Sequence, residues 1–296
     1  MADAAILDTR ERIFAGIFLT SLAYFLFSVQ DASIKLLVTG YSVWQILLFR
    51  SVTILMGCVA IGGRDLLAES VRSPIVRPML LRSFLILAAW LCYYSAAGYL
   101  QLAELTTIYF AAPVIVTIMS IPILGESVPA ARWIAVFTGF AGVLVACDPA
   151  KLGISLPVAL VLAAAFLWGL SIVLLRKVAM QARSLVQLVL NNGFFLVIAG
   201  LPMLFVWQTP VASDQLLMFG VGVLGGVAQF VLFEGMRRAP VSIISPFEYT
   251  SLVWAFVLGY LIWGDFPRTE VFYGAALIIA AGLIIIASEH LRNRSG

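Results

Sequence analysis

The segment Phe25-Leu26-Phe27-Ser28 is echoed 141 positions later by Phe166-Leu167-Trp168-Gly169. Three further pairs follow in the same order at almost the same offset: Ser42 to Gln45 with Ser184 to Gln187 (142), Gly125-Glu126 with Gly264-Asp265 (139), and Gly142 with Gly282 (140). Matches at nearly one spacing indicate an internal duplication, so the chain is predicted to consist of two homologous halves.

The sequence around these segments is strongly apolar, with 62% hydrophobic and 11% charged residues among 296. A soluble domain has about 25% charged residues, and lipid is the solvent that suits so much apolar surface. About 20 apolar residues span a bilayer as a helix. Ten transmembrane helices are therefore expected, at residues 12–36, 42–62, 75–98, 101–123, 130–147, 154–176, 183–206, 214–236, 241–262 and 268–289. The connection 62–74 is long enough for a short interfacial helix.

The positive charges predict how these helices are oriented. Of the 18 lysines and arginines, fourteen fall on the side of both termini, three (Lys35, Lys151 and Arg268) on the opposite side, and Arg50 lies inside the second helix. Lysine and arginine concentrate on the cytoplasmic side of membrane proteins. Both termini are therefore predicted to be cytoplasmic, in a multi-pass protein of the bacterial inner membrane.

The duplication and the helix count together predict the architecture. Five helices is an odd number, so the second half must enter the membrane with the opposite orientation. We predict an all-α polytopic membrane protein with two inverted five-helix repeats, at 12–147 and 154–289, and cytoplasmic tails at 1–11 and 290–296. Inverted repeats are typical of secondary transporters, which bind substrate near the bilayer midplane between the halves and expose it alternately to each side.

The same features resemble the drug/metabolite transporter superfamily, EamA type. The resemblance covers almost the whole chain and is carried by Gly125-Glu126, its echo Gly264-Asp265, Pro113 in the fourth helix and the run Ala239 to Ser242. Asp265 departs conservatively from the glutamate common in the family. The segment Pro246 to Trp254 looks most like the YddG-type amino-acid exporters. This resemblance implies transport of amino acids and related metabolites, often outward across the bacterial inner membrane.

Arg50, in the middle of the second helix, is an ionisable group at membrane depth, and such groups usually face a cavity or a partner. Two interpretations stand: an anion contact, or a structural charge bonded to backbone carbonyls or reaching the interface. Asn192 occupies the equivalent place in the second half. A polar group at both positions favours the structural interpretation.

Glu248 is the polar residue that we expect on the translocation path. It follows Pro246, which frees backbone groups that are tolerated at this depth only beside protein or a water-filled cavity. Ser245, Glu248, Tyr249 and Leu252 are predicted to share one face of the ninth helix. A purely structural carboxylate is the alternative.

The other acidic residues near the membrane edges are predicted to form ion pairs at helix ends. Asp31 and Lys35 stand four residues apart on the first helix, a spacing that favours pairing. Glu104 begins the fourth helix, and Glu234 precedes Arg237 and Arg238 by one turn.

Aromatic residues suggest the character of the substrate. Trp and Tyr also anchor helices at membrane interfaces, which accounts for Tyr41, Trp207 and Trp263 at helix ends. A second group is expected to line a pocket for an amphipathic or aromatic substrate, with packing inside the bundle as the alternative: Tyr24, Phe27, Trp90, Tyr94, Tyr99 and Trp168.

Small residues mark close contacts between helices. Gly222 and Gly226 form such a pair on the eighth helix, and the fifth helix carries a stripe of Ala135, Gly139, Gly142 and Ala146. Packing within the molecule is favoured over a dimer face, so a monomer or weak homodimer is expected. Gln229 lies near the side of Gly222 and Gly226 and is predicted to reach a cavity.

No motif points to a metal, a cofactor or an enzyme. The three cysteines lie in apolar runs, and the one histidine, His290, lies in the C-terminal tail, so neither a metal site nor a disulfide framework is expected. An intramembrane enzyme would need a nucleophile and base or metal ligands, and a channel would need a selectivity ring. We expect a secondary transporter that exports amino acids, aromatic or otherwise hydrophobic, and related small metabolites. Another small metabolite or a drug is the alternative; the partners are the substrate and the lipid bilayer, without nucleic acid.

Overall fold

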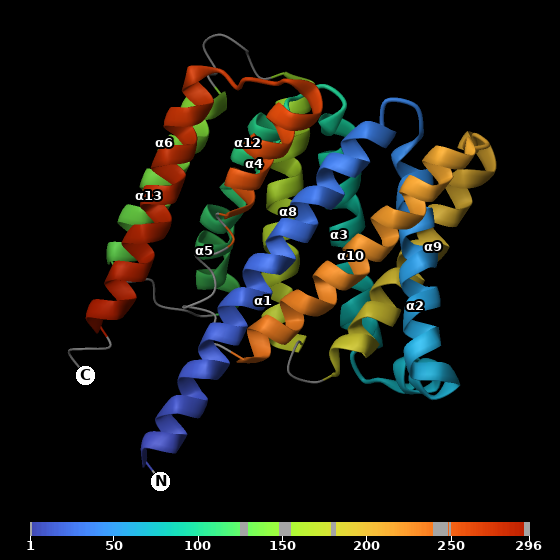
Figure 1. Ribbon diagram of the computed structural model, residues 1–296, viewed down its shortest axis with the longest axis horizontal. Helices are drawn as coiled ribbons and strands as arrows, with labels where there is room; N and C mark the ends of the chain where they lie inside the picture. The colour runs from blue at the N-terminus through green and yellow to red at the C-terminus, as the bar shows by residue number, and fades with distance from the viewer. Residues whose placement is uncertain are drawn as a thin grey trace.

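The computed structural model describes residues 2–124, 130–147, 155–178, 182–238, 248 and 250–292. Every regular element within these ranges is a helix: α1 (Ala2–Leu37), α2 (Val43–Arg72), α3 (Val76–Ala97), α4 (Leu102–Tyr109), α5 (Ala111–Leu124), α6 (Ala130–Cys147), α8 (Leu156–Val178), α9 (Ser184–Val206), α10 (Ala212–Arg238), α12 (Thr250–Trp263) and α13 (Thr269–Arg292). They form one bundle, in which α1 begins and α13 ends at the same end (Figure 1). We call this end the termini side and the opposite end the far side.

The length and apolar composition of the helices suit a membrane. Five helices contain windows long and apolar enough to cross a bilayer, at Phe14–Leu37, Val43–Arg72, Val76–Ala97, Ser184–Met203 and Ala212–Leu232. Shorter apolar stretches lie in α6, α8, α12 and α13. Large side chains such as Phe14, Phe18 and Phe205 are more than 60% exposed, as expected of residues that face lipid rather than water.

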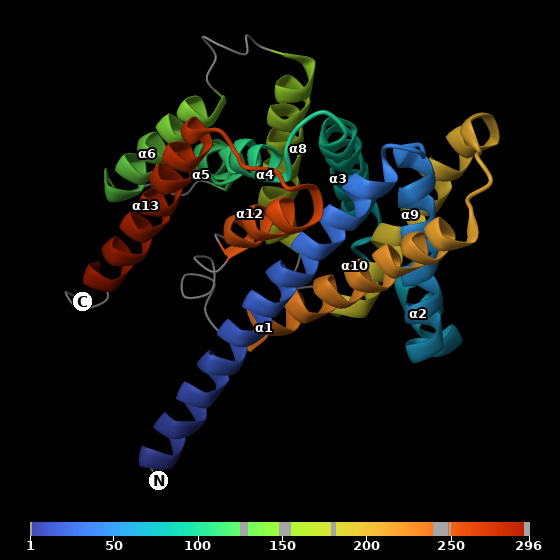
Figure 2. The same cartoon turned by 45° about the horizontal axis from the view of Figure 1, so that its top comes forward.

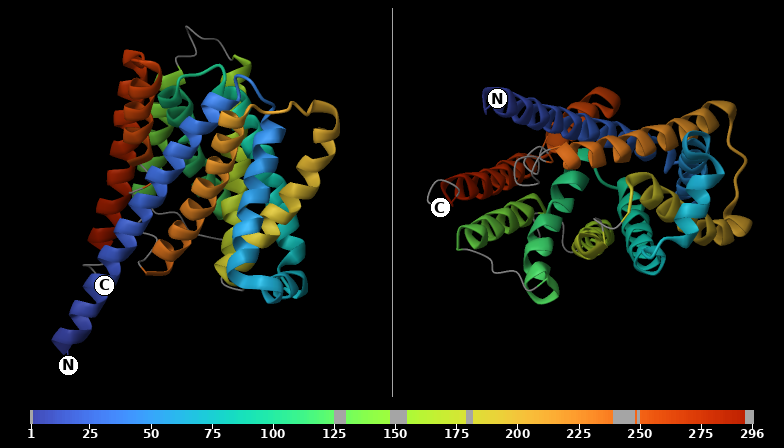
Figure 3. Two further views of the ribbon diagram at one scale, coloured as in Figure 1. Left: turned by 45° about the vertical axis from the view of Figure 1, so that its right-hand side comes forward. Right: turned by 90° about the horizontal axis from the view of Figure 1, so that it is seen from below.

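The helices pair in a pattern that reflects the duplication. Contacts join α1 to α10, α3 to α8, α2 to α9, α4 to α12 and α6 to α13. Exchanging the first-half helices with their second-half equivalents turns the α1–α10 pair into the α8–α3 pair and maps the other three onto themselves. α1 rises from the termini side whereas α8, its equivalent, descends from the far side (Figures 1 and 3). The fold is therefore two inverted five-helix repeats, as the sequence predicts.

Three elements differ from their predicted bounds. α1 begins at Ala2, so most of the expected tail 1–11 is helical and extends beyond the bundle (Figures 2 and 3). No proline or glycine interrupts that segment, and alanine, leucine and glutamate favour helix. α2 continues past its expected end at residue 62, but Gly63 has φ 60 and ψ −158, so a separate short helix follows the kink. This matches the expected helix within 62–74.

The fourth predicted helix, 101–123, is divided into α4 and α5 at Phe110. Pro113 stands in the first turn of α5, where the missing N–H of a proline is tolerated, whereas the interior of one unbroken helix would not tolerate it. The helix therefore restarts at Ala111. In the second half, α12 begins at Thr250, and Glu248 lies in a 3₁₀ turn before it. Residues 239–247 and Tyr249 lie outside the described residues.

Small residues bring α10 against α2. A Cβ atom at Gly222 would collide with the Cβ atom of Thr53, and one at Gly226 would lie 3.2 Å from Ile54. On α6, a Cβ atom at Gly142 would lie 2.7 Å from the Gly274 carbonyl of α13. Both glycine sites therefore serve packing within the molecule, which is the interpretation that the sequence favours.

Charged side chains link the two halves on the far side. Arg268, just before α13, lies 2.9 Å from Glu104 at the start of α4. Lys35 at the end of α1 donates to the Leu100 carbonyl at 2.6 Å and lies 3.8 Å from Asp265. Gly264, with φ 68, makes the turn that places Asp265 after α12. Glu104 therefore forms the ion pair that the sequence predicts, whereas Lys35 pairs across the halves rather than with Asp31.

Candidate substrate-binding cavity

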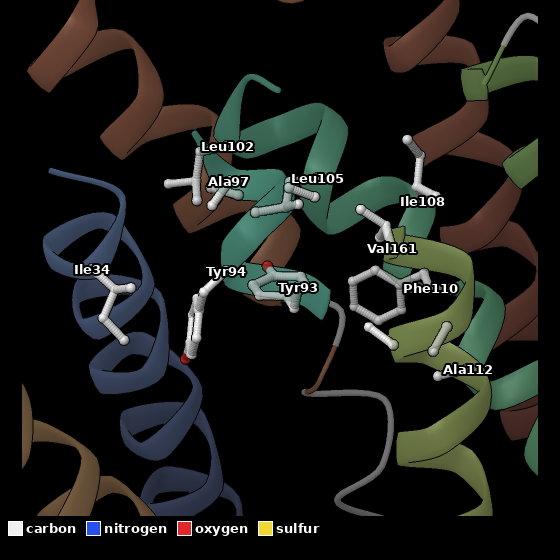
Figure 4. Close-up of a cluster of buried hydrophobic side chains, with 14 of the residues drawn as sticks. Ile34, Tyr93, Tyr94, Ala97, Leu102, Leu105, Ile108, Phe110, Ala112 and Val161 are labelled. Carbon is white, nitrogen blue, oxygen red and sulfur yellow. The ribbon is translucent and has the colours of Figure 1, made fainter. Parts of the chain in front are cut away.

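A cavity of about 180 Å³ lies inside the bundle, between the two halves. Its walls come from α1 to α4 of the first half and from α8, α10 and α12 of the second, together with Phe110 and Glu248. The lining residues that carry charge, hydroxyl, amide or aromatic groups are Tyr24, Phe27, Ser28, Gln30, Asp31, Arg50, Arg82, Trp90, Tyr93, Tyr94, Thr106, Tyr109, Phe110, Trp168, Gln229, Glu248 and Ser251. Apolar side chains of the main buried cluster surround this part of the bundle (Figure 4).

Asp31 of α1 is hydrogen-bonded to a tyrosine hydroxyl of α3. Tyr94 donates a hydrogen bond to Asp31 Oδ1 at 3.0 Å, and the Gln30 amide donates to the Tyr94 hydroxyl oxygen at 3.1 Å. Tyr93 lies near the same carboxyl group. Figure 4 shows Tyr94 reaching from α3 toward α1. The carboxyl group is therefore fixed in place by a neutral donor, and α1 and α3 are joined at this level.

Arg50 of α2 is 1% exposed, and its guanidinium lies 4.0 Å from the centroid of the Trp90 ring. None of its three side-chain nitrogens has a hydrogen-bond partner within the described ranges. A cation over an aromatic face gains some stabilisation, but unfilled hydrogen bonds of a buried charge remain costly. The arrangement leaves five N–H donors available to an anionic ligand.

Gly225 of α10 makes room for this polar group. A Cβ atom there would collide with Gln30 Oε1 and would lie 2.8 Å from Arg50 Nε. The side chains of Gln30 and Arg50 therefore pack directly against the α10 backbone. Glycine is the residue that permits so close an approach.

Glu248 occupies the part of the cavity beside Tyr24. The Tyr24 hydroxyl lies near the Glu248 carboxyl, and the Ser251 hydroxyl donates to the Glu248 backbone carbonyl at 2.7 Å. Ser251 and Ala255 continue the lining along α12, whereas Leu252 is 1% exposed within the apolar cluster. Leu252 itself does not line the cavity, and its sharing of a face with Glu248 stays a prediction.

Aromatic rings form much of the remaining wall. Tyr93 makes edge contacts with Tyr94 and Tyr109, at centroid distances of 5.4 and 5.1 Å. Trp90 makes a similar contact with Phe195 of α9 at 5.2 Å. Trp168 and Phe27 contribute rings from α8 and α1. These contacts fix the rings against one another, so the cavity presents flat apolar surfaces beside its polar groups.

The structure brings most of the sequence-predicted site residues together. Eight of them line the cavity: Tyr24, Phe27, Arg50, Trp90, Tyr94, Trp168, Gln229 and Glu248. Tyr99 does not, since it follows the end of α3 and is 80% exposed. Asn192 is buried on α9 and donates to the Leu188 carbonyl at 2.9 Å. Ser245, Pro246 and Tyr249 lie outside the described residues.

Asn192 and Arg50 therefore differ in their surroundings although their sequence positions correspond. Asn192 bonds to its own helix and is absent from the cavity lining, whereas Arg50 lines the cavity. A shared packing role for the two residues stays a prediction. Among the described residues, side chains from the first half supply most of the polar wall.

Sequence reasoning missed Asp31, Arg82, Tyr93 and Tyr109. Asp31 was expected to pair with Lys35, but Lys35 extends to Leu100 and Asp265 on the far side and Asp31 turns to Tyr94. The spacing of these residues could have revealed them. Tyr24, Ser28 and Asp31 lie on one face of α1, and Arg82, Ala89 and Tyr93 lie on one face of α3.

A membrane protein built from two inverted halves, with a polar and aromatic cavity enclosed between them, belongs to the class of carrier-type transporters. The family model of the EamA-like transporter family matches residues 14–147 and 155–287. The chain belongs to this family. A solved crystal structure shares its fold, with a TM-score of 0.65 and 20% identity over 97% of this chain and 99% of that one.

The chain is also similar to named transporters. It is 25% identical to the S-adenosylmethionine uptake transporter of Rickettsia prowazekii (strain Madrid E) over 281 residues, which are 92% of this chain and 94% of that protein. It is 30% identical to the riboflavin transporter of Vibrio cholerae serotype O1 over 186 residues, 62% of this chain and 61% of that one. A riboflavin transporter of Rhizobium johnstonii is 31% identical over 178 residues, or 58% and 57% of the two chains. These similarities support a transporter of small metabolites.

Proposed function

We propose that the protein is a carrier for small metabolites that combine an α-amino-acid head group with a flat apolar body. The Arg50 guanidinium would bind the substrate carboxylate, and the neighbouring Asp31 carboxyl would bind its ammonium group. The rings of Trp90, Tyr93 and Tyr109 would hold the flat body. Aromatic amino acids have both parts, as the sequence resemblance implies.

One observation carries this proposal. Arg50 is buried in the cavity wall without a hydrogen-bonding partner within the described ranges, close to the Asp31 carboxyl group, which accepts a hydrogen bond from Tyr94. A charged group buried in a membrane protein is costly unless something pairs with it. A zwitterion would satisfy the guanidinium and the carboxyl group together.

The named relatives support the same substrate chemistry. S-adenosylmethionine carries an α-amino-acid head and a planar adenine, so it shares both features with the aromatic amino acids. Riboflavin has a planar ring system without the amino-acid head. A flat heteroaromatic metabolite is therefore the second candidate, favoured by the aromatic walls of the cavity and by the riboflavin transporters among the relatives.

Two observations favour opposite directions of transport. The resemblance to amino-acid exporters favours export, whereas relatives named as uptake transporters favour import. We propose alternating access, which allows both, in a bacterial inner membrane with the termini on the cytoplasmic side. The domain limits 12–147 and 154–289 belong to the same proposal.

Purified protein in liposomes tests the function directly. Counterflow of radiolabelled L-phenylalanine, L-methionine, S-adenosylmethionine and riboflavin should be compared with that of L-glutamate and L-lysine. We expect trans-stimulated exchange of substrates with an amino-acid head and an apolar body, and weak exchange of the two charged amino acids. Exchange of riboflavin alone would replace the proposed substrate with the second candidate. Flux without trans-stimulation would contradict a carrier.

A further inference from the structure

Arg82 of α3 is a second buried guanidinium in the cavity wall. The residue is 4% exposed, and its Nε has no hydrogen-bonding partner within the described ranges. No described acidic side chain forms an ion pair with it. The Oγ of its neighbour Ser83 lies 2.6 Å from the Met79 carbonyl and 2.8 Å from Asn191 Oδ1 of α9, within hydrogen-bonding distance of both. This contact holds α3 against α9 while Arg82 lines the cavity.

Arg82 lies deeper from the far side than Arg50. At about 1.5 Å of rise per residue, Arg82 is about 22 Å along α3 from its far-side end at Ala97, whereas Arg50 is about 10 Å along α2 from Val43. By the same measure, Asp31 is about 9 Å from the end of α1, and Ser251 about 18 Å from the end of α12. The polar lining therefore divides into two levels.

Each level combines one carboxyl group with one guanidinium. The upper level, near the far side, has Asp31 bonded by Tyr94, and Arg50. The lower level has Arg82, and Glu248 beside Tyr24, in the same lining. In the described ranges all three side-chain nitrogens of Arg50 and the Nε of Arg82 have no hydrogen-bond partner, so both levels offer N–H donors to a ligand.

We infer that the lower level is a second binding site for the substrate head group, on the termini side of the first. Arg82 binds the substrate carboxylate there. This inference rests on the proposed function. A cavity of about 180 Å³ holds one such substrate at a time, so the two levels are occupied in succession as the substrate crosses.

The lower level predicts that loss of Arg82 affects substrate binding differently from the two sides of the membrane. A substrate that arrives from the termini side meets Arg82 first, and one that arrives from the far side meets Arg50 first. Vesicles that expose either face, identified with a tag on one terminus, allow the Michaelis constant for L-phenylalanine to be measured from each side. We expect Arg82→Gln to raise that constant about tenfold from the termini side and less than about twofold from the far side, the scale of one lost charge-assisted hydrogen bond.

Two comparisons separate a binding role from a structural one. Arg77→Gln removes an exposed arginine from the same helix and should change neither constant. Phenethylamine, which lacks the carboxylate, should be handled equally by the wild type and by Arg82→Gln, and Arg82→Lys should recover part of the affinity for L-phenylalanine.

The outcomes distinguish this inference from the proposed function. If wild-type protein carries no substrate with an amino-acid head, both are wrong. If wild-type protein carries L-phenylalanine but Arg82→Gln changes both sides equally, or changes phenethylamine as much as L-phenylalanine, only the lower site is wrong. If Arg82→Gln changes nothing, the lower site is again wrong while the site at Arg50 stands.

Discussion

At the scale of single residues, the cavity is defined by charges whose partners are incomplete. Arg50 contacts the Trp90 ring but makes no hydrogen bond within the described part of the chain, and Asp31 accepts a hydrogen bond from the Tyr94 hydroxyl rather than from a cation. A protein interior that served only stability would gain by replacing such groups with apolar ones of similar volume. The retained charges are therefore the basis on which we propose a ligand site.

Replacing Arg50 tests its contact with the substrate carboxylate. We expect Arg50→Gln to raise the Michaelis constant for L-phenylalanine about tenfold or more from both sides of the membrane, because a charge-assisted hydrogen bond is lost. Phenethylamine transport should change little. Arg64→Gln removes an exposed arginine of the same helix and is the control. Equal losses for the amine and the amino acid would point to a structural role for Arg50.

A methyl group at Gly225 should displace the side chains that rest on α10. Gly225→Ala places its Cβ against Gln30 and 2.8 Å from Arg50 Nε, so transport should fall about tenfold, as for a loss of roughly 1.4 kcal/mol of binding. Gly220→Ala on the same helix meets nothing within 4 Å. That control should keep full transport and gain up to about 1 kcal/mol of stability from helix propensity. Equal activity of the two variants would contradict the close approach at Gly225.

Glu248 is the group we would test first for proton coupling. We expect Glu248→Gln to abolish the response of transport to an imposed pH gradient while leaving exchange of L-phenylalanine measurable, because glutamine keeps the shape but cannot carry the proton. Asp65→Asn, at an exposed position outside the cavity, should retain the response. A pH response equal to that of the wild type would remove Glu248 from coupling.

At the scale of elements, the helices approach one another through small residues and break where proline or glycine requires it. α10 contacts α2 at Gly222, and the fourth span restarts after Phe110. The break places Tyr109 and Phe110 at the cavity wall. In an unbroken helix, the direction of these two side chains would be fixed by the helices on both sides.

The contact between α10 and α2 can be tested by a paired substitution. Gly222→Ala forces its methyl group against the Cβ atom of Thr53, so we expect a loss of roughly 1–3 kcal/mol of stability, as for other overpacked sites. Thermal unfolding in detergent measures it. Thr53→Gly removes the colliding atom and should restore stability in the double variant, whereas Thr53→Ser keeps that atom and should not. Restoration by serine would contradict the contact.

At the scale of the whole molecule, ion pairs between the halves hold the far side together. Arg268–Glu104 and Lys35–Asp265 both join the first half to the connection between α12 and α13. Lys35 also lies 4.9 Å from the centroid of the Trp263 ring. Their side chains are 11% to 33% exposed, whereas those of the Arg183–Glu69 pair are 71% and 44% exposed. The far-side pairs are therefore the better shielded.

Reversing one of these charges should open the far side. In a cysteine-free background with Thr106→Cys in the cavity wall, we expect Glu104→Arg to increase labelling by a membrane-impermeant maleimide several-fold. The double variant Glu104→Arg with Arg268→Glu should return labelling toward the starting rate. Reversing the exposed pair Arg183 and Glu69 should have little effect, because exposed ion pairs contribute about 0–1 kcal/mol. Equal labelling of the single and double variants would show that this ion pair does not keep the far side of the cavity closed.

The sequence by itself determined the inverted architecture and most of the cavity's aromatic wall. Both depend on features that repeat along the chain: apolar lengths, the offset near 140, and residues such as Trp90 and Trp168 placed well inside helices. The tertiary structure alone decided which charges meet. Lys35 contacts Asp265 and the Leu100 carbonyl rather than Asp31, and Arg50 packs against the Trp90 ring. Such pairings depend on which helices become neighbours and how each is rotated. A spacing within one helix does not contain that information.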